Sequence, residues 1–228
     1  EQLQSTRTRR INLLRGMLRE FGIAVPVGLA RGRTAVREAL EIADNGLPDL
    51  LRPMIAETLQ EITTLTERIA RIEATLTALT RTDPVVQCLL ELPGVGLLGA
   101  SALRAAVGDI QRFPTGRHFA SWLGLTAREH SSAETRRLGR ISKQGDAYLR
   151  TLLVHGARSA LCAAARAHSQ GRPLDRLRLW ALATEQRRGR NKATVALANK
   201  LARIIWATWR YQRPFAGDWP ARLETTPS

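Results

Sequence analysis

The stretch that most restricts the fold is a long apolar repeat between Pro53 and Leu79. Its apolar residues recur every three or four positions, the spacing that places side chains along one face of an α-helix. The repeat therefore predicts a heptad-like helix about 40 Å long at 1.5 Å per residue. The seam consists of Ile55, Leu59, Ile62, Leu65, Ile69, Ile72, Leu76 and Leu79.

Two packing partners are open to this seam. The helix pairs with its copy in a second subunit, or it packs on the basic helix expected from Glu1 to Phe21. Its length favours pairing, which predicts a homo-oligomer through residues 53–82. Helical periodicity recurs in most of the remaining chain, without a run of alternating strands. We therefore predict an all-α, mainly helical fold, in which the heptad-like helix precedes a compact helical domain.

The order of these patterns predicts four segments. They are a basic helical segment (1–52), a coiled-coil-like helix (53–82), a compact C-terminal domain (83–213) and a flexible tail (214–228). The C-terminal domain is expected to contain a helix-hairpin-helix motif over 92–113 and a block of serines and arginines over 124–150.

Positive charge is concentrated in the second half of the chain. The net charge is +15, and between Arg128 and Arg213 there are 19 Lys and Arg against 5 Asp and Glu, a balance of +14. A surplus of this size predicts a polyanionic partner, with nucleic acid the first candidate, docking on the C-terminal half. Arginine suits bidentate phosphate contacts. A GC-rich genome gives the same preference for arginine over lysine without explaining the clustering.

A glycine-containing turn, Pro93-Gly94-Val95-Gly96, stands between two short apolar helices. Glycines let backbone N–H groups approach an anion closely, and the following helix N-terminus adds partial positive charge. We predict that Gly94 and Gly96 contact the DNA backbone in a helix-hairpin-helix motif. The alternative is an ordinary corner between two packed helices.

Two adjacent serines, Ser131 and Ser132, lie in a polar block rich in basic residues. A serine hydroxyl is a weak nucleophile alone, but guanidinium groups beside it position a phosphate and stabilise charge on its oxygens. A second basic cluster is expected to form a turn before the last helix. The predicted DNA-binding cations are Arg128, Arg136, Arg137, Arg140, Lys143 and Arg150 in the block, and Arg187, Arg188, Arg190 and Lys192 in the turn.

Other functions receive little support from the sequence. Cys88 and Cys162 are isolated in apolar surroundings, which favours reduced structural cysteines, and no metal-ligand spacing is present. There is no apolar run long enough to span a bilayer and no signal peptide. The chain begins without methionine, in what reads as the middle of a basic helix. This start predicts a fragment or a trimmed product.

Several blocks together resemble the C-terminal half of transposases from the insertion-sequence family that includes elements 110, 116 and 902, in the subgroup typified by element 1111. The resemblance extends to about Pro214. The blocks are LPGVGLLGASAL, FASWLGLTAREHSS, RRLGRISKQGDAYLRTLLVHGARSAL and NKATVALANKLARIIW.

This resemblance implies a serine nucleophile that forms a covalent phosphoserine link with DNA during strand exchange. The role carries over to Ser131 or Ser132. Counting back from Ser142 favours Ser131, whereas the family's Ser-Gly pair favours Ser132, with Ala133 in the place of glycine. Both serines therefore remain candidate catalytic residues.

The resemblance also implies a RuvC-like nuclease domain whose acidic residues bind magnesium, upstream of this chain. We accordingly expect no cofactor bound by this chain, which binds DNA but does not cut it alone. Expected partners are transposon ends, target DNA and an element-encoded guide RNA, in the bacterial cytoplasm at the nucleoid. The alternatives are a non-catalytic helix-hairpin-helix protein that grips the DNA backbone and an RNA-associated basic protein.

Overall fold

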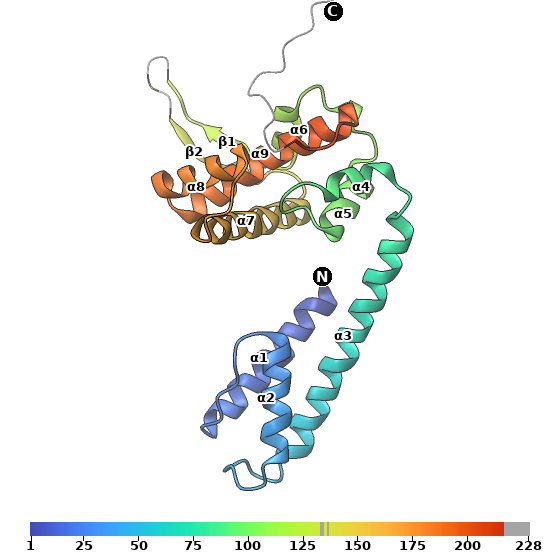
Figure 1. The fold of residues 1–228 in the computed structure, drawn as a ribbon, viewed down its shortest axis with the longest axis vertical. Coiled ribbons are helices and arrows are strands. Elements are labelled where there is room, and N and C mark those ends of the chain that lie inside the picture. Colours follow the sequence, from blue (N-terminus) through green and yellow to red (C-terminus); the bar gives the residue numbers. More distant parts are fainter. Residues whose placement is uncertain (133–134, 136, 217–228) are drawn as a thin grey trace, which may run out of the picture. The chain divides into compact units, whose positions relative to one another are not determined.

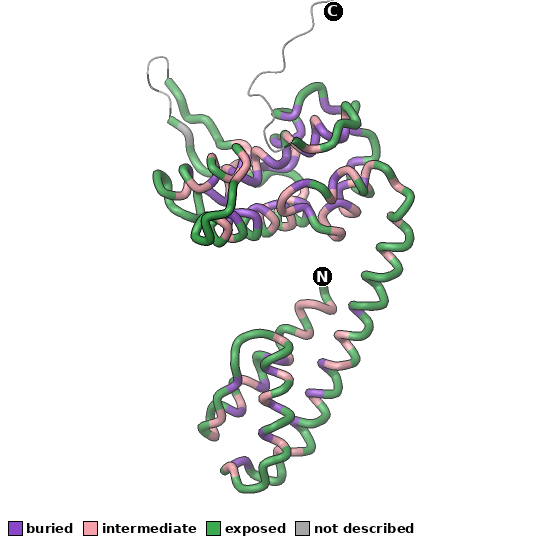
Figure 2. The backbone as a smooth tube through the Cα atoms, in the orientation of Figure 1, coloured by how far each residue is buried: buried purple, intermediate pink, exposed green. Residues whose placement is uncertain are grey.

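The computed structural model describes residues 1–132, 135 and 137–216, which fold mainly as α-helices (Figure 1). This confirms the predicted all-α class. The chain divides after Leu76 into two compact units, and Figure 2 shows that each has buried residues of its own. The N-terminal unit contains α1 (Gln2–Glu20), α2 (Leu29–Glu41) and most of α3 (Arg52–Thr80).

The N-terminal unit is a small helical assembly with one apolar cluster. Leu14 of α1, Val36 of α2 and Ile55 of α3 are fully buried in this cluster. An ion pair of 2.7 Å between Arg10 Nε and Glu61 Oε2 also joins α1 to α3. The first part of the predicted seam therefore packs on the chain's own helices.

The second part of the seam has a different environment. Ile69 is buried, but Ile72 is 53% exposed and Leu79 is 73% exposed. The apolar repeat of α3 thus continues beyond the part that packs on α1 and α2.

The C-terminal unit is built around its last helix. Its elements are α4 (Pro84–Leu90), α5 (Leu97–Val107), the 3-10 helix η1 (Ile110–Arg112), α6 (Gly116–Trp122), β1 (Ala127–Glu129), β2 (Leu138–Ile141), α7 (Ala147–Ser169), α8 (Arg176–Arg188) and α9 (Arg190–Tyr211). α9 packs on α6, α7 and α8, and its Leu201 and Ile205 are fully buried. The indole N–H of Trp206 donates to the carbonyl oxygen of Phe113 over 2.9 Å. Residues far apart in the sequence therefore meet along α9.

The turn between α4 and α5 packs closely on α7. A Cβ atom at Gly94 would overlap the carbonyl group of Gly156, and one at Gly156 would overlap that of Gly94. Gly94 also has a φ of +83°, a region that side chains disfavour. Gly96, which precedes α5, has open space around its Cα. Backbone packing therefore explains the glycine at 94, and the helix-hairpin-helix motif stays a prediction.

Two short strands form a hairpin within the block of serines and arginines, residues 124–150. β1 and β2 pair antiparallel, with Ala127 opposite Ile141 and Glu129 opposite Leu138. Strands of three and four residues are too short to show a clear alternating pattern, which is why the sequence did not reveal them. After the hairpin, the Asp146 carboxylate accepts from the backbone N–H groups of Tyr148 and Leu149 and starts α7.

Only Gly189 separates α8 from α9. The prediction of a basic turn before the last helix is wrong, because Arg187 and Arg188 end α8 whereas Arg190 and Lys192 begin α9. Gly189 has a φ of +79° and a ψ of 158°, a backbone conformation that glycine adopts readily and that does not continue a helix. The basic cluster is therefore helical on both sides of one glycine.

Candidate functional site

Both candidate serines are accessible. Ser131 and Ser132 are exposed and follow β1 in the hairpin. The hairpin continues past the strands, since the N–H of His130 donates to the carbonyl of Arg137 over 2.8 Å. Ser132 and Thr135 exchange backbone hydrogen bonds of 3.2 and 3.0 Å. Backbone hydrogen bonds thus hold both serines in the hairpin, where their side chains are exposed.

Ser131 has a defined polar environment. Its hydroxyl donates to Glu129 Oε1 over 2.7 Å, and its Oγ accepts from the backbone N–H of Arg137 over 3.2 Å. A carboxylate at this distance is an acceptor for the hydroxyl proton, and the N–H group fixes the position of the oxygen. Glu129 was not predicted as a site residue, although it lies only two positions before Ser131.

The predicted cations of the block have different environments. Arg128 is exposed, and its NH2 group donates across the hairpin to the carbonyl of Ser142 over 3.1 Å. Arg150 is half-buried and donates to the carbonyl of Leu123 over 3.2 Å, so it stabilises the loop before the hairpin. Arg137 is exposed. Arg136 lies outside the described residues.

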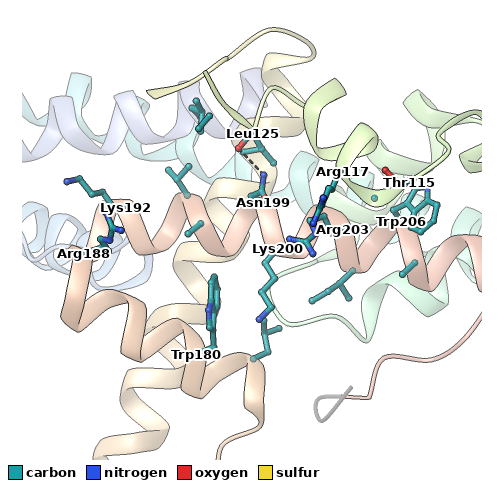
Figure 3. A pocket seen from close by; sticks show the side chains of 18 of the residues that line it. Thr115, Arg117, Leu125, Trp180, Arg188, Lys192, Asn199, Lys200, Arg203 and Trp206 are labelled. Carbon is teal, nitrogen blue, oxygen red and sulfur yellow. Dashed lines mark hydrogen bonds between the residues drawn. The ribbon is translucent and has the colours of Figure 1, made fainter. Parts of the chain in front are cut away.

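A cationic groove runs along α9 (Figure 3). Its volume is about 1760 Å³, and α6, α8, α9 and the β1–β2 hairpin contribute to its lining. Among the described residues that line it, none is acidic. Four of its cations were predicted: Arg140, Lys143, Arg188 and Lys192.

Four further cations of the cationic groove were not predicted: Arg117, Arg176, Lys200 and Arg203. On α9 a usable signal existed, because Lys192, Asn199 and Arg203 recur at steps compatible with one helix face. Arg117 gives no such signal, since only the packing of α6 on α9 brings it to the groove. In that packing Asn199 Nδ2 donates to the carbonyl of Leu125 over 3.0 Å (Figure 3).

Lys200 is the most constrained cation of the groove. Its Nζ lies 4.1 Å from the ring centroid of Trp180, a cation–π geometry. Partial burial, and secondarily the nearby charge of Arg203, lower the pKa of Lys200. Both effects disfavour the charged amine, so a bound anion would stabilise it.

The other predicted site residues lie elsewhere. Arg187 is exposed on α8. The NH2 group of Arg190 is 2.7 Å from Cys162 Sγ, which links the start of α9 to α7. Gly96 is exposed at the start of α5, whereas Gly94 faces α7.

The described residues form neither a cluster of metal ligands nor a membrane-spanning helix. No three His, Cys, Asp or Glu side chains there are grouped so that they can hold a metal ion. None of the described helices has the length and apolar character that crossing a bilayer requires.

Comparison with known proteins identifies the family. Residues 86–172 match the model described as transposase IS116/IS110/IS902 family. The chain is 43% identical over 211 residues to a probable family 20 transposase of Pseudomonas aeruginosa, covering 90% of this chain and 60% of that protein. It is 36% identical over 215 residues to the transposase for insertion sequence element IS1111A of Coxiella burnetii, covering 94% and 57%. A putative transposase of Sinorhizobium fredii is 38% identical over 206 residues, covering 90% and 51%.

These matches cover most of this chain but a smaller share of each relative. The chain spans between about half and 60% of the length of these three relatives. The family model includes the serine hairpin and ends before α8 and α9, which complete the cationic groove. The relatives match nine tenths of the chain or more. The chain therefore belongs to the IS116/IS110/IS902 family of insertion-sequence transposases.

Proposed function

We propose that this chain binds DNA during transposition and supplies the serine that attacks a DNA phosphodiester. The observation that carries the proposal is the position of the hairpin. Its strands form part of the wall of the cationic groove, and the same hairpin carries Ser131 beyond those strands. A phosphate backbone held by the groove would therefore run towards an accessible hydroxyl group.

The cationic groove supplies the affinity in this proposal. Guanidinium and ammonium groups neutralise phosphates and release the ions that surround DNA. The absence of acidic side chains among the described lining residues removes a source of repulsion. In this proposal Arg137, whose backbone N–H contacts Ser131, holds the phosphate that reacts, whereas Arg128 is held towards Ser142 and binds the strand nearer the groove. Such contacts position the backbone without reading the base sequence.

We assign the nucleophile to Ser131 because its hydroxyl already donates to Glu129. Glu129 takes the proton while Oγ forms a bond to phosphorus. The bond between phosphorus and a deoxyribose oxygen breaks, and that oxygen takes a proton from water. The products are a strand linked to Ser131 as a phosphodiester and a strand with a free hydroxyl group. Neighbouring guanidinium groups stabilise the charge that develops on the phosphate oxygens.

The test is a covalent protein–DNA adduct. Protein expressed from the whole reading frame that encodes this chain is incubated with element-end DNA and magnesium, then separated on a denaturing gel. We expect an adduct for the wild type and for Ser132→Ala, and none for Ser131→Ala. An adduct that survives Ser131→Ala and disappears in Ser132→Ala would reassign the nucleophile, and one that survives in the double variant would refute serine chemistry.

The second candidate is a non-catalytic DNA-binding protein that only grips the backbone. The helical corner at Gly94 and the cationic groove suit this function as well. It predicts unchanged DNA affinity and no adduct with any of these proteins. A wild-type protein that binds RNA tightly but does not bind DNA would favour an RNA-associated protein instead.

Three partners belong to the proposal. We assign magnesium to an acidic nuclease domain rather than to residues of this chain, and part of the basic surface to a guide RNA.

We also propose a homo-oligomer through the exposed apolar residues of α3, Ile72 and Leu79. Sedimentation should show an oligomer that Ile72→Gln with Leu79→Gln dissociates. A monomeric wild type would exclude it.

A further inference from the structure

The cationic groove has an apolar floor as well as a charged rim. Half-buried aliphatic residues line it, among them Ile141 of β2 and Val195 and Ile204 of α9. The ring of Trp180 contributes from α8 (Figure 3). An apolar floor gains free energy only from a ligand that covers it with an apolar face of its own.

Trp180 and the neighbouring cations form the most distinctive part of this floor. Trp180 is half-buried, and Lys200 lies against its ring at 4.1 Å. Arg203 is exposed about one turn further along α9. An aromatic ring with cations beside it is the combination that binds single-stranded nucleic acid, because a base stacks while its phosphates meet the charges.

A DNA duplex does not use such a floor. It presents phosphates outward and keeps the faces of its bases stacked inside, so cations alone serve to bind it. Charged phosphates placed over aliphatic side chains would lose water without gaining a partner. An unpaired strand exposes base faces and phosphates together, and therefore matches both parts of the cationic groove.

We propose that the cationic groove holds an unpaired segment of the DNA strand that carries the scissile phosphate. The choice of that strand rests on the proposed function, because Gly139, Arg140 and Ile141 in the groove lining belong to the hairpin that carries Ser131. A strand lying along α9 and leaving past the hairpin brings its next phosphates to the serine. The duplex must accordingly open beside the cleavage site before Ser131 attacks.

The test measures binding to three labelled oligonucleotides of equal length by fluorescence anisotropy. They are a thymidine homopolymer, a uridine homopolymer and a mixed-sequence DNA duplex. Trp180→Leu removes the stacking face but keeps an apolar side chain. Lys200→Gln with Arg203→Gln removes two groove charges. Arg158→Gln with Arg166→Gln removes two exposed charges on α7 outside the cationic groove and serves as the matched control.

We expect each groove variant to weaken binding of the thymidine strand about tenfold or more. Trp180→Leu should leave duplex affinity nearly unchanged, and the α7 control should barely affect the strand. Thermal unfolding followed by circular dichroism verifies folding, and the two groove variants are independent, so either one decides if the other unfolds.

Three results would overturn the inference. Equal weakening of strand and duplex binding by Trp180→Leu would mean that no base stacks in the cationic groove. Tighter binding of the uridine strand than of the thymidine strand would exclude DNA as the occupant. Duplex binding without strand binding would exclude an unpaired occupant and leave the proposed function intact, whereas loss of all DNA binding in the wild type would refute the proposed function itself.

Discussion

Glu129 is the residue at which the proposed chemistry is most sensitive. In the wild type, Glu129 Oε1 accepts a hydrogen bond from the Ser131 hydroxyl over 2.7 Å. Glu129→Gln keeps an oxygen acceptor at this position, but an amide cannot take up the proton. We expect adduct formation to slow about 100-fold, the usual contribution of a general base, with DNA affinity nearly unchanged. Rates measured by quenched gel assays, with Ser132→Ala as the control, decide this. Equal rates for wild type and Glu129→Gln would limit the carboxylate to a structural role.

Asp83 links stability to pH. Its carboxylate caps α4 by accepting from Val85 and Val86 N–H groups and pairs with Arg104 Nε at 3.0 Å. Partial burial raises the pKa of Asp83, but these hydrogen bonds and the Arg104 charge together outweigh it, so the net pKa is lowered below 3.8. The stabilisation that the charged Asp83 provides is therefore complete above pH 3.8, the ordinary pKa of the group, and it is lost as the pH falls through the lower pKa of the folded state.

Replacing Asp83 removes this pH-dependent stabilisation. Asp83→Asn keeps an oxygen that can cap α4 but removes the charge that pairs with Arg104, so it should lower the free energy of unfolding at neutral pH by about 0.5 kcal/mol. The difference in unfolding free energy between this variant and the wild type should shrink as the pH falls below 3.8. Urea denaturation at several pH values measures it. A difference that stays constant through this range would mean that the charge of Asp83 contributes nothing.

At the scale of residues, the sequence predicted what local chemistry determines. The charge of the block and of the Arg187–Lys192 cluster brought Arg140, Lys143, Arg188 and Lys192 into the predicted set, and they do line the cationic groove. Arg117 and Arg176 could not be found in this way, because only tertiary packing brings α6 and the start of α8 to α9. Whether any of these residues contacts DNA stays a prediction.

At the scale of elements, the α4–α5 turn tests packing against DNA contact. A Cβ at Gly94 would overlap the backbone of Gly156, so Gly94→Ala should destabilise the protein by about 2–3 kcal/mol through overpacking and backbone strain. Gly96→Ala meets open space and should change stability little. Thermal unfolding and duplex affinity are measured for both. A stable Gly94→Ala protein with weakened DNA binding would reverse this assignment.

The helices and the turn between α4 and α5 were largely predictable, whereas the β1–β2 hairpin and the break between α8 and α9 were not. The three- and four-residue repeat of α3 and the apolar spacing of α9 are long enough to identify each helix from the sequence. The hairpin strands are too short for this, and the α8–α9 break depends on one left-handed residue, Gly189. A basic cluster around a glycine reads as a turn, although helix continues on both sides of it.

At the scale of the whole molecule, charge distribution predicts the response to salt. Among the residues that the structure describes, eight cations line the cationic groove. If all contact phosphates of an unpaired strand, the logarithm of affinity should fall with the logarithm of salt concentration with a slope of about −6. Lys192→Gln should flatten the slope by about 0.7, whereas Arg158→Gln on α7 should not change it. A titration of anisotropy against salt measures both, and identical slopes for the two variants would show that the bound phosphates do not follow the groove.

Because α9 is central to the C-terminal unit, this unit can fold only after α9 has been synthesised. α6, α7 and α8 all bury apolar residues against α9, so their core is incomplete until α9 has left the ribosome. The same helix carries Lys192, Lys200 and Arg203 of the cationic groove. A chain that stops before Arg190 would therefore lack both a complete core in the C-terminal unit and these groove cations, and it would not compete with the intact protein for its nucleic acid.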